Sequence, residues 1–223
     1  MTKDIRQWPL TGKFSSMDIE GDGHADNRPI EIGIIDYDGG QVVGSRYWLI
    51  NPERKIQDYV RKYVHGITDR MVKNCPTFAD IEHEFRAAMQ GITLVGHGLK
   101  NDFKILRSVM ATPELLPDKI VDTSTLAKLV LNRPQKISLE KACIALGIRV
   151  PDEFRCPRPG FHGATEDAYA TGQLLLELPK LIPDEPSVVK QISNNVLVNV
   201  DKAKRELASK MDNAVDPSYG HTP

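Results

Sequence analysis

Cysteine and long apolar runs are both scarce in this chain of 223 residues. The three cysteines, Cys75, Cys143 and Cys156, are odd in number and far apart, and no C-x-x-C pair occurs. This spacing argues against a disulfide framework and against a zinc ribbon. The first residues, MTKDIRQWPLTGK, have no apolar core of signal-peptide type, and no later run is long enough to span a membrane. We therefore expect a cytoplasmic protein with no membrane partner.

A strong charge of either sign is also missing, because the formal net charge is -1 at pH 7. Such a chain is poorly suited to coat nucleic acid by bulk electrostatics. The charge is nevertheless uneven, since residues 96–160 contain eleven Lys or Arg against seven Asp or Glu. This excess is compatible with a phosphate-facing surface and equally with a solvated helix face, and the sequence leaves both open.

The pattern of apolar residues predicts an α/β fold. Three strand-like segments open the chain, KFSSMDIE, IEIGIIDY and QVVGSRYWLI, and a DGG turn joins the last two, which predicts a three-strand antiparallel meander. The segment PTFADIEHEFRAAMQG predicts a helix with Thr77 as its N-cap and Gly91 as its stop. The short buried strands ITLVGH and KIVDT then alternate with helical segments. Strands in this order favour a mixed sheet, meander plus parallel strands, flanked by helices.

The C-terminal part predicts a helical extension. Apolar residues recur there at spacings of three and four, which indicates a helix with one apolar stripe formed by Val189, Ile192, Val196, Val200, Ala203, Leu207 and Met211. The stripe packs either on its own domain or on a second copy of the chain, as a homodimer, and both alternatives stay open. We divide the chain into a main domain, residues 1–182, and an extension, residues 183–223, that ends in a disordered tail.

Four acidic residues occupy positions that favour a metal site. Asp18 and Glu20 stand two residues apart near the end of the first strand, so both project from one face, where their repulsion requires a cation or open water. Asp102 begins a helix after the strand ITLVGH, and Asp167 lies in the first turn of ATEDAYATGQ. In an open α/β sheet these positions gather at one edge, where ligands bind. Four carboxylates there predict a site for hard cations such as Mg²⁺ or Mn²⁺.

Each acid alone has a simpler explanation, because D-x-E pairs occur by chance and Asp102 or Asp167 could merely cap a helix. Their order and surroundings are more specific. The segments MDIEGDG, LVGHGLKNDFKIL and FHGATEDAYATGQLL resemble, in this order, the three exonuclease motifs of the DnaQ-like, DEDDh family of 3′-to-5′ exonucleases. The resemblance runs from about Lys13 to Leu178, and the third motif, H-x-A-x-x-D-A, is matched at His162, Ala164, Asp167 and Ala168.

The resemblance implies a ribonuclease H-like fold and two Mg²⁺ or Mn²⁺ ions held by Asp18, Glu20, Asp102 and Asp167. It also implies that His162 is the general base, a role that suits a side chain titrating near neutrality. The expected activity is hydrolysis of phosphodiester bonds at the 3′ end of single-stranded DNA or RNA, with release of nucleoside 5′-monophosphates.

Residues beside the motifs are candidates for substrate binding, namely Gly21, Gly23, His24, His97 and Lys100. For His97 the alternative is a role in ordering the turn of the second motif. The chain departs from many proofreading members, because Gly21, Asp22 and Gly23 stand in place of Thr-Thr-Gly and Gly98 in place of Asn. These positions shape the pocket for the terminal nucleotide, so the choice between RNA and DNA stays open.

Two other functional classes are compatible with parts of the pattern. A ribonuclease H-like endonuclease would use similar acids and metals, but it would not require His162 in the H-x-A-x-x-D spacing. A catalytically weak nucleic-acid-binding module would be expected to have lost an acid or the histidine. The complete set of residues favours the exonuclease over both alternatives.

Overall fold

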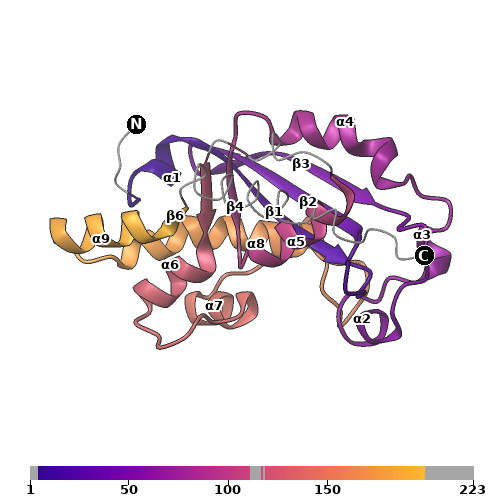
Figure 1. Ribbon diagram of the computed structural model, residues 1–223. Coiled ribbons are helices and arrows are strands. Elements are labelled where there is room, and N and C mark those ends of the chain that lie inside the picture. Colours follow the sequence, from indigo (N-terminus) through magenta and orange to yellow (C-terminus); the bar gives the residue numbers. More distant parts are fainter. Residues whose placement is uncertain (1–4, 111–116, 118, 199–223) are drawn as a thin grey trace, which may run out of the picture.

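The computed structural model describes residues 5–110, 117 and 119–198. A single mixed sheet lies at the centre of the fold (Figure 1). The sheet has six strands in the order β3-β2-β1-β4-β5-β6. Their bounds are β1 (Lys13–Gly21), β2 (Pro29–Asp38), β3 (Gln41–Leu49), β4 (Thr93–Gly96), β5 (Lys119–Asp122) and β6 (Leu197–Val198). The first three strands pair antiparallel, β1, β4 and β5 run parallel, and β6 is antiparallel to β5. The predicted meander and mixed α/β sheet are confirmed.

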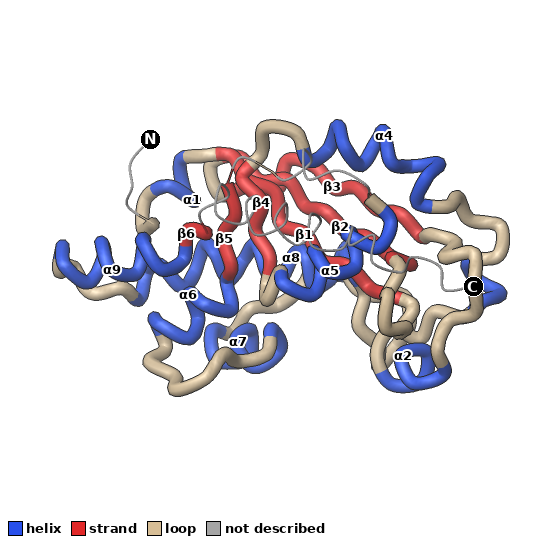
Figure 2. The backbone as a smooth tube through the Cα atoms, viewed as in Figure 1, coloured by secondary structure: helices blue, strands red, loops and turns tan. Residues whose placement is uncertain are grey.

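Helices cover both faces of this sheet, and α4 and α6 lie on opposite sides of it (Figure 2). The helices are α1 (Trp8–Thr11), α2 (Asp58–Tyr63), α3 (Asp69–Val72), α4 (Phe78–Met89), α5 (Lys100–Val109), α6 (Thr123–Val130), α7 (Leu139–Leu146), η2 (Asp152–Phe154), α8 (Ala164–Glu177), η3 (Leu178–Leu181) and α9 (Pro186–Val196). Thr77 caps α4 in a capping box with Asp80, and the helix ends two residues before Gly91, as predicted.

The side chains of each strand alternate between the two faces of the sheet, so they pack into two separate hydrophobic cores. On β2, Ile32 and Ile34 point into a cluster with α4 and α5, whereas Ile35 and Tyr37 point into a cluster with α6, α8 and α9. This alternation explains why β2 reads as a nearly continuous apolar run, since helices bury both of its faces.

The first turn of α8 rests directly on β2. A side chain at Gly33 of β2 would place its Cβ 2.4 Å from the backbone carbon of Ala164, so only glycine permits this approach. Because Ala164 begins α8, the close contact fixes where the helix starts relative to the sheet. The position of Asp167, three residues further along, follows from it.

The C-terminal extension differs from the single long helix that the apolar stripe predicts. Helix α9 ends at Val196, and Leu197–Val198 pair with β5 as the edge strand β6. The β-branched residues of NNVLVNV favour a strand, and β5 offers an open edge for pairing. Val189, Ile192 and Val196 are buried in the core that α6 and α8 share, a core that continues across the predicted boundary after residue 182. This half of the stripe is therefore covered by its own chain.

The remaining half of the stripe, from Val200 to Met211, and the tail lie outside the described residues, so the homodimer stays a prediction there. Within the described ranges, every helix is too short or too polar to cross a membrane.

Candidate active site

Three carboxylates meet at the C-terminal end of β1. Asp18 and Glu20 lie on the same face of this strand, as predicted, and Asp167 reaches them from the first turn of α8. One carboxylate oxygen of each residue lies within 4.8 Å of those of the other two. The structure therefore brings together three acids that are separated by almost the whole domain in sequence.

The fourth predicted acid, Asp102, approaches the same strand from the first turn of α5. It is buried, and burial raises its pKa to about 7, although hydrogen bonds from the backbone at Asp102 and Ile19 act in the opposite direction. Ile19 separates Asp18 from Glu20, so Asp102 lies beside the pair. Its charge also raises the pKa of Asp18. Asp102 is nevertheless not part of the tight group of three.

Burial and repulsion between carboxylates disfavour the ionised state of Asp18 and Glu20. Burial is the largest cause that raises the pKa of Asp18 well above its usual value, followed by the charge of Asp167. The same two causes raise the pKa of Glu20 to about 7. Acids that hold their protons so strongly lack compensating positive charge. A divalent cation would supply that charge, and an all-oxygen donor set fits Mg²⁺ or Mn²⁺.

His162 stands over the edge of the acidic group. Its Nδ1 lies 3.4 Å from Oδ2 of Asp167, and its side chain is 55% exposed. The hydrogen bond with Asp167 is the main reason that the pKa of His162 rises to about 9. The backbone amide of His162 donates to the carbonyl of Val64 at 3.0 Å, which ties its loop to the segment that follows α2.

A buried ion pair that the sequence reasoning missed supports this loop. Glu31 on β2 accepts a hydrogen bond from Nη2 of Arg158 at 2.8 Å and another from the amide of Ala164 at 3.0 Å. The same guanidinium donates to the carbonyls of His65, at 2.6 Å, and His162, at 3.2 Å. Glu31 thus holds both the start of α8 and the loop of His162. The available signal was an acid in the otherwise apolar run IEIGII.

His97, a candidate for substrate binding, uses both ring nitrogens within the protein. Nε2 is 2.9 Å from the carbonyl of Ile137, and Nδ1 is 3.0 Å from Oγ1 of Thr123. Burial lowers the pKa of His97. The geometry favours the alternative role, in which His97 orders the turn after β4.

The remaining candidates line the turn after β1 and the start of α5. Nε2 of His24 is 2.9 Å from the carbonyl of Lys55. A Cβ at Gly21 would meet the side chain of Asn27, and Gly23, with φ +85°, packs on Val60 of α2. Lys100 is exposed at the first position of α5. Their roles in substrate binding stay predictions.

The mixed sheet carries acids at the end of its first strand and on the facing helix α8, which is the arrangement that the sequence predicts. The sequence matches the RNase T exonuclease family over residues 16–175. The chain belongs to this exonuclease family, which confirms the resemblance seen in its motifs.

Relatives within the family include both RNA and DNA enzymes by name. The chain is 30% identical over 166 residues to RNA exonuclease 4 of Mycosarcoma maydis, which covers 72% of this chain and 40% of that protein. It is 32% identical over 144 residues to the DNA polymerase III subunit epsilon of Treponema pallidum, covering 61% of this chain and 66% of that protein. The chain thus spans about two fifths of the first relative.

Solved structures confirm the fold. Exonuclease X in complex with 5′ overhanging duplex DNA has a TM-score of 0.59 at 23% identity and covers 81% of this chain and 99% of that chain. The nuclease domain of 3′hExo, a DEDDh family member bound to rAMP, has a TM-score of 0.61 at 15% identity, with coverages of 75% and 92%.

Proposed function

We propose that this protein is a divalent-metal-dependent 3′-to-5′ exonuclease that releases nucleoside 5′-monophosphates from single-stranded DNA or RNA. The observation that carries the proposal is the convergence of Asp18, Glu20 and Asp167 within 4.8 Å, with His162 3.4 Å from Asp167. An endonuclease of the same fold needs the acids but has no requirement for this histidine. The names of the relatives point to RNA and DNA alike, so both substrates belong to the proposal.

The acids fit two Mg²⁺ or Mn²⁺ ions, which when bound would activate a water and stabilise charge on the leaving 3′ oxygen. The protein holds the acidic side chains in place through the elements that carry them. Asp18 and Glu20 are fixed by β1, Asp167 by the start of α8, and Asp102 supports the strand from α5. His162 takes the proton of the attacking water at Nε2, because its Nδ1 faces Asp167.

The protonation of His162 depends on the charge around it. Attraction to Asp167 and Glu20 raises its pKa to about 9, which would keep the ring protonated near neutral pH. Carboxylates that held cations would attract the ring less, so the pKa of His162 would fall and its neutral form would become available. The histidine is therefore expected to act as a base only when the acids hold metal.

The proposal is tested with 5′-labelled single-stranded RNA and DNA in Mg²⁺, Mn²⁺ or chelator. We expect progressive shortening from the 3′ end with nucleoside 5′-monophosphate as product, and a 3′-phosphate end should be a poor substrate because the pocket must admit the terminal residue. Asp167→Asn is the matched control, and it should be inactive in Mg²⁺. Rapid cutting of a closed circular strand would contradict the exonuclease, and equal activity in chelator would contradict the metal requirement.

A further inference from the structure

Two tyrosine rings stand exposed on the short helix α2. Tyr59 is 69% exposed and Tyr63 is 72% exposed, whereas Tyr37 and Trp48 are buried in the cores. The ring centroids of Tyr59 and Tyr63 are 5.5 Å apart, and the ring planes are tilted by 48°. The rings are thus neighbours that do not stack on each other, and each keeps a face for another flat group. Their exposure leaves them little part in the apolar core.

Helix α2 is attached to the active site at two points. The carbonyl of Val64, next to Tyr63 in the chain, accepts the hydrogen bond from the amide of His162 at 3.0 Å. Val60, next to Tyr59, packs on Gly23 in the turn that follows Glu20, where a Cβ would lie 2.8 Å from its Cγ2. The pair of tyrosines therefore sits on an element that bridges the His162 loop and the end of β1.

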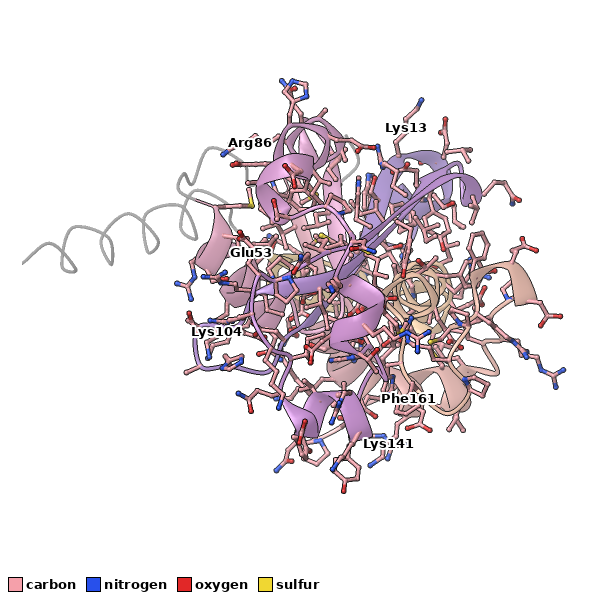
Figure 3. All side chains as sticks on the ribbon, turned by 90° about the vertical axis from the view of Figure 1, so that its right-hand side faces the viewer. Lys13, Glu53, Arg86, Lys104, Lys141 and Phe161 are labelled. Carbon is pink, nitrogen blue, oxygen red and sulfur yellow. The ribbon has the colours of Figure 1, made fainter. Side chains whose placement is uncertain are left out.

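The same end of the molecule carries the loop of the third motif. In Figure 1, α2 lies at the right-hand side, and Figure 3 faces that side and labels Phe161, the residue before His162. The ring of Phe161 packs on Gly66, two residues after Val64, where a Cβ would lie 2.7 Å from it. This contact is a further link between the segment after α2 and the loop of the catalytic histidine.

The charges on α2 suit a polyanion. Its one acid, Asp58, is paired with Arg61 at 2.7 Å, and Lys62 is exposed between the two tyrosines in sequence. Flat aromatic faces beside cations are the usual means by which proteins bind single-stranded nucleic acid without reading its sequence, with bases on the rings and phosphates on the cations. A nucleic-acid strand whose 3′ end lies in the active site would continue past α2. The ligand of this surface is therefore the same strand that the enzyme shortens.

We propose that Tyr59 and Tyr63 form a stacking platform for bases of the single strand upstream of the scissile bond, with Lys62 facing its phosphates. The inference rests on the proposed function, because it assigns the path of that enzyme's substrate. It predicts that longer strands bind more tightly than a dinucleotide, since only they extend beyond the active site to α2.

The test measures binding of 5′-labelled single-stranded oligonucleotides by fluorescence anisotropy in chelator, which keeps the strand intact. Replacing each tyrosine with leucine, as Tyr59→Leu and Tyr63→Leu, retains apolar bulk but removes the flat ring. We expect the Kd of a longer strand to rise by about 5- to 150-fold for each ring removed, the range found for loss of base stacking. Tyr59→Phe and Tyr63→Phe are the matched controls, and they should bind as the wild type does.

Each outcome bears on a different part of the proposal. An unchanged Kd in the leucine variants would overturn the platform while leaving the exonuclease intact. Weaker binding in those variants of a protein that cuts no free 3′ end would support the platform and contradict the proposed function. A shift in oligomeric state in the leucine variants, measured by light scattering with Kd unchanged, would assign the surface to a second copy of the chain and overturn the platform.

Discussion

Asp167 interacts both with the other two carboxylates of the group and with the ring of His162. It belongs to the group of three carboxylates that suits a cation, and it also lies 3.4 Å from Nδ1 of His162. Without positive charge in the group, Asp167 attracts a proton to the histidine and raises its pKa to about 9. In the proposed mechanism, one carboxylate therefore couples the occupancy of the metal site to the availability of the base.

The variant His162→Ala separates the base from the ligands. It retains the four carboxylates, so metal and nucleic-acid binding should persist, whereas turnover should fall by about 10²- to 10⁴-fold, the usual contribution of a positioned general base. Asp167→Asn should differ, because losing a ligand charge weakens metal binding and added Mn²⁺ should partly restore its activity. The measurement is kcat at saturating Mg²⁺ and across a Mn²⁺ titration. Near-normal turnover in His162→Ala would remove the base from this residue.

The sequence predicted the acids and His162, but it did not predict the ion pair that positions them. The acids and His162 lie in local motifs, so spacing alone could group them, and the structure places three acids and the histidine together. Glu31 and Arg158 are 127 residues apart and share no local pattern. Their pairing follows from the packing of α8 on β2, which only the folded chain reveals.

At the scale of elements, the pair of Glu31 and Arg158 connects a strand, a loop and a helix. Both side chains are nearly buried, with 1% exposure for Glu31 and 11% for Arg158. Each buried charge is therefore compensated by the opposite charge of its partner. Glu31 also accepts a hydrogen bond from the amide at the start of α8, and Arg158 donates to the carbonyls of His65 and His162. The pair thus positions Asp167 and His162 relative to β1.

We expect Arg158→Met to destabilise the protein by about 3–5 kcal/mol, because it leaves the buried charge of Glu31 without its cationic partner. Adding Glu31→Gln removes that charge and should recover most of the free energy of unfolding. Turnover should stay low in the double variant, since the carbonyls of His65 and His162 still lack their guanidinium donor. Urea unfolding and kcat measure the two effects.

Arg155→Met is the matched control for that pair. Arg155 lies in the same loop, but its ion pair with Asp152 is exposed, with 59% and 93% exposure, so its loss should change stability by at most about 1 kcal/mol. If turnover returned together with stability in the double variant, Arg158 would be a stabilising residue without influence on the site.

The C-terminal extension is helical as predicted over Pro186–Val196, but Leu197–Val198 form a strand where the apolar spacing predicts more helix. The spacing of three and four continues from Val189 past Val196 and predicts a helix throughout. What ends the helix is the open edge of β5, which pairs with Leu197–Val198. Edge availability is a property of the assembled sheet, so periodicity alone cannot include it.

At the scale of the whole molecule, the buried acids Glu20 and Asp102 lower the stability of the protein when they are ionised. Folding raises the pKa of Glu20 and Asp102 to about 7, above the values of an unfolded chain, so the folded state binds protons more tightly. Their unfavourable contribution is full above about pH 7 and disappears as the pH falls toward the unfolded values. His65 acts in the opposite sense, because burial lowers its pKa to about 4 and stability is lost as the pH falls below about 6.5.

The stabilisation by Mn²⁺ should therefore depend on pH. At about pH 8 the ionised acids bind the cation and Tm should rise, whereas at about pH 5 protons occupy the same carboxylates and the rise should shrink. Comparing Tm with Mn²⁺ and with chelator at each pH cancels the contribution of His65, which is common to both. The variant Glu20→Gln should show a smaller rise at the higher pH, because it has lost one carboxylate of the group. Equal stabilisation at both pH values would mean that the cation binds away from these acids.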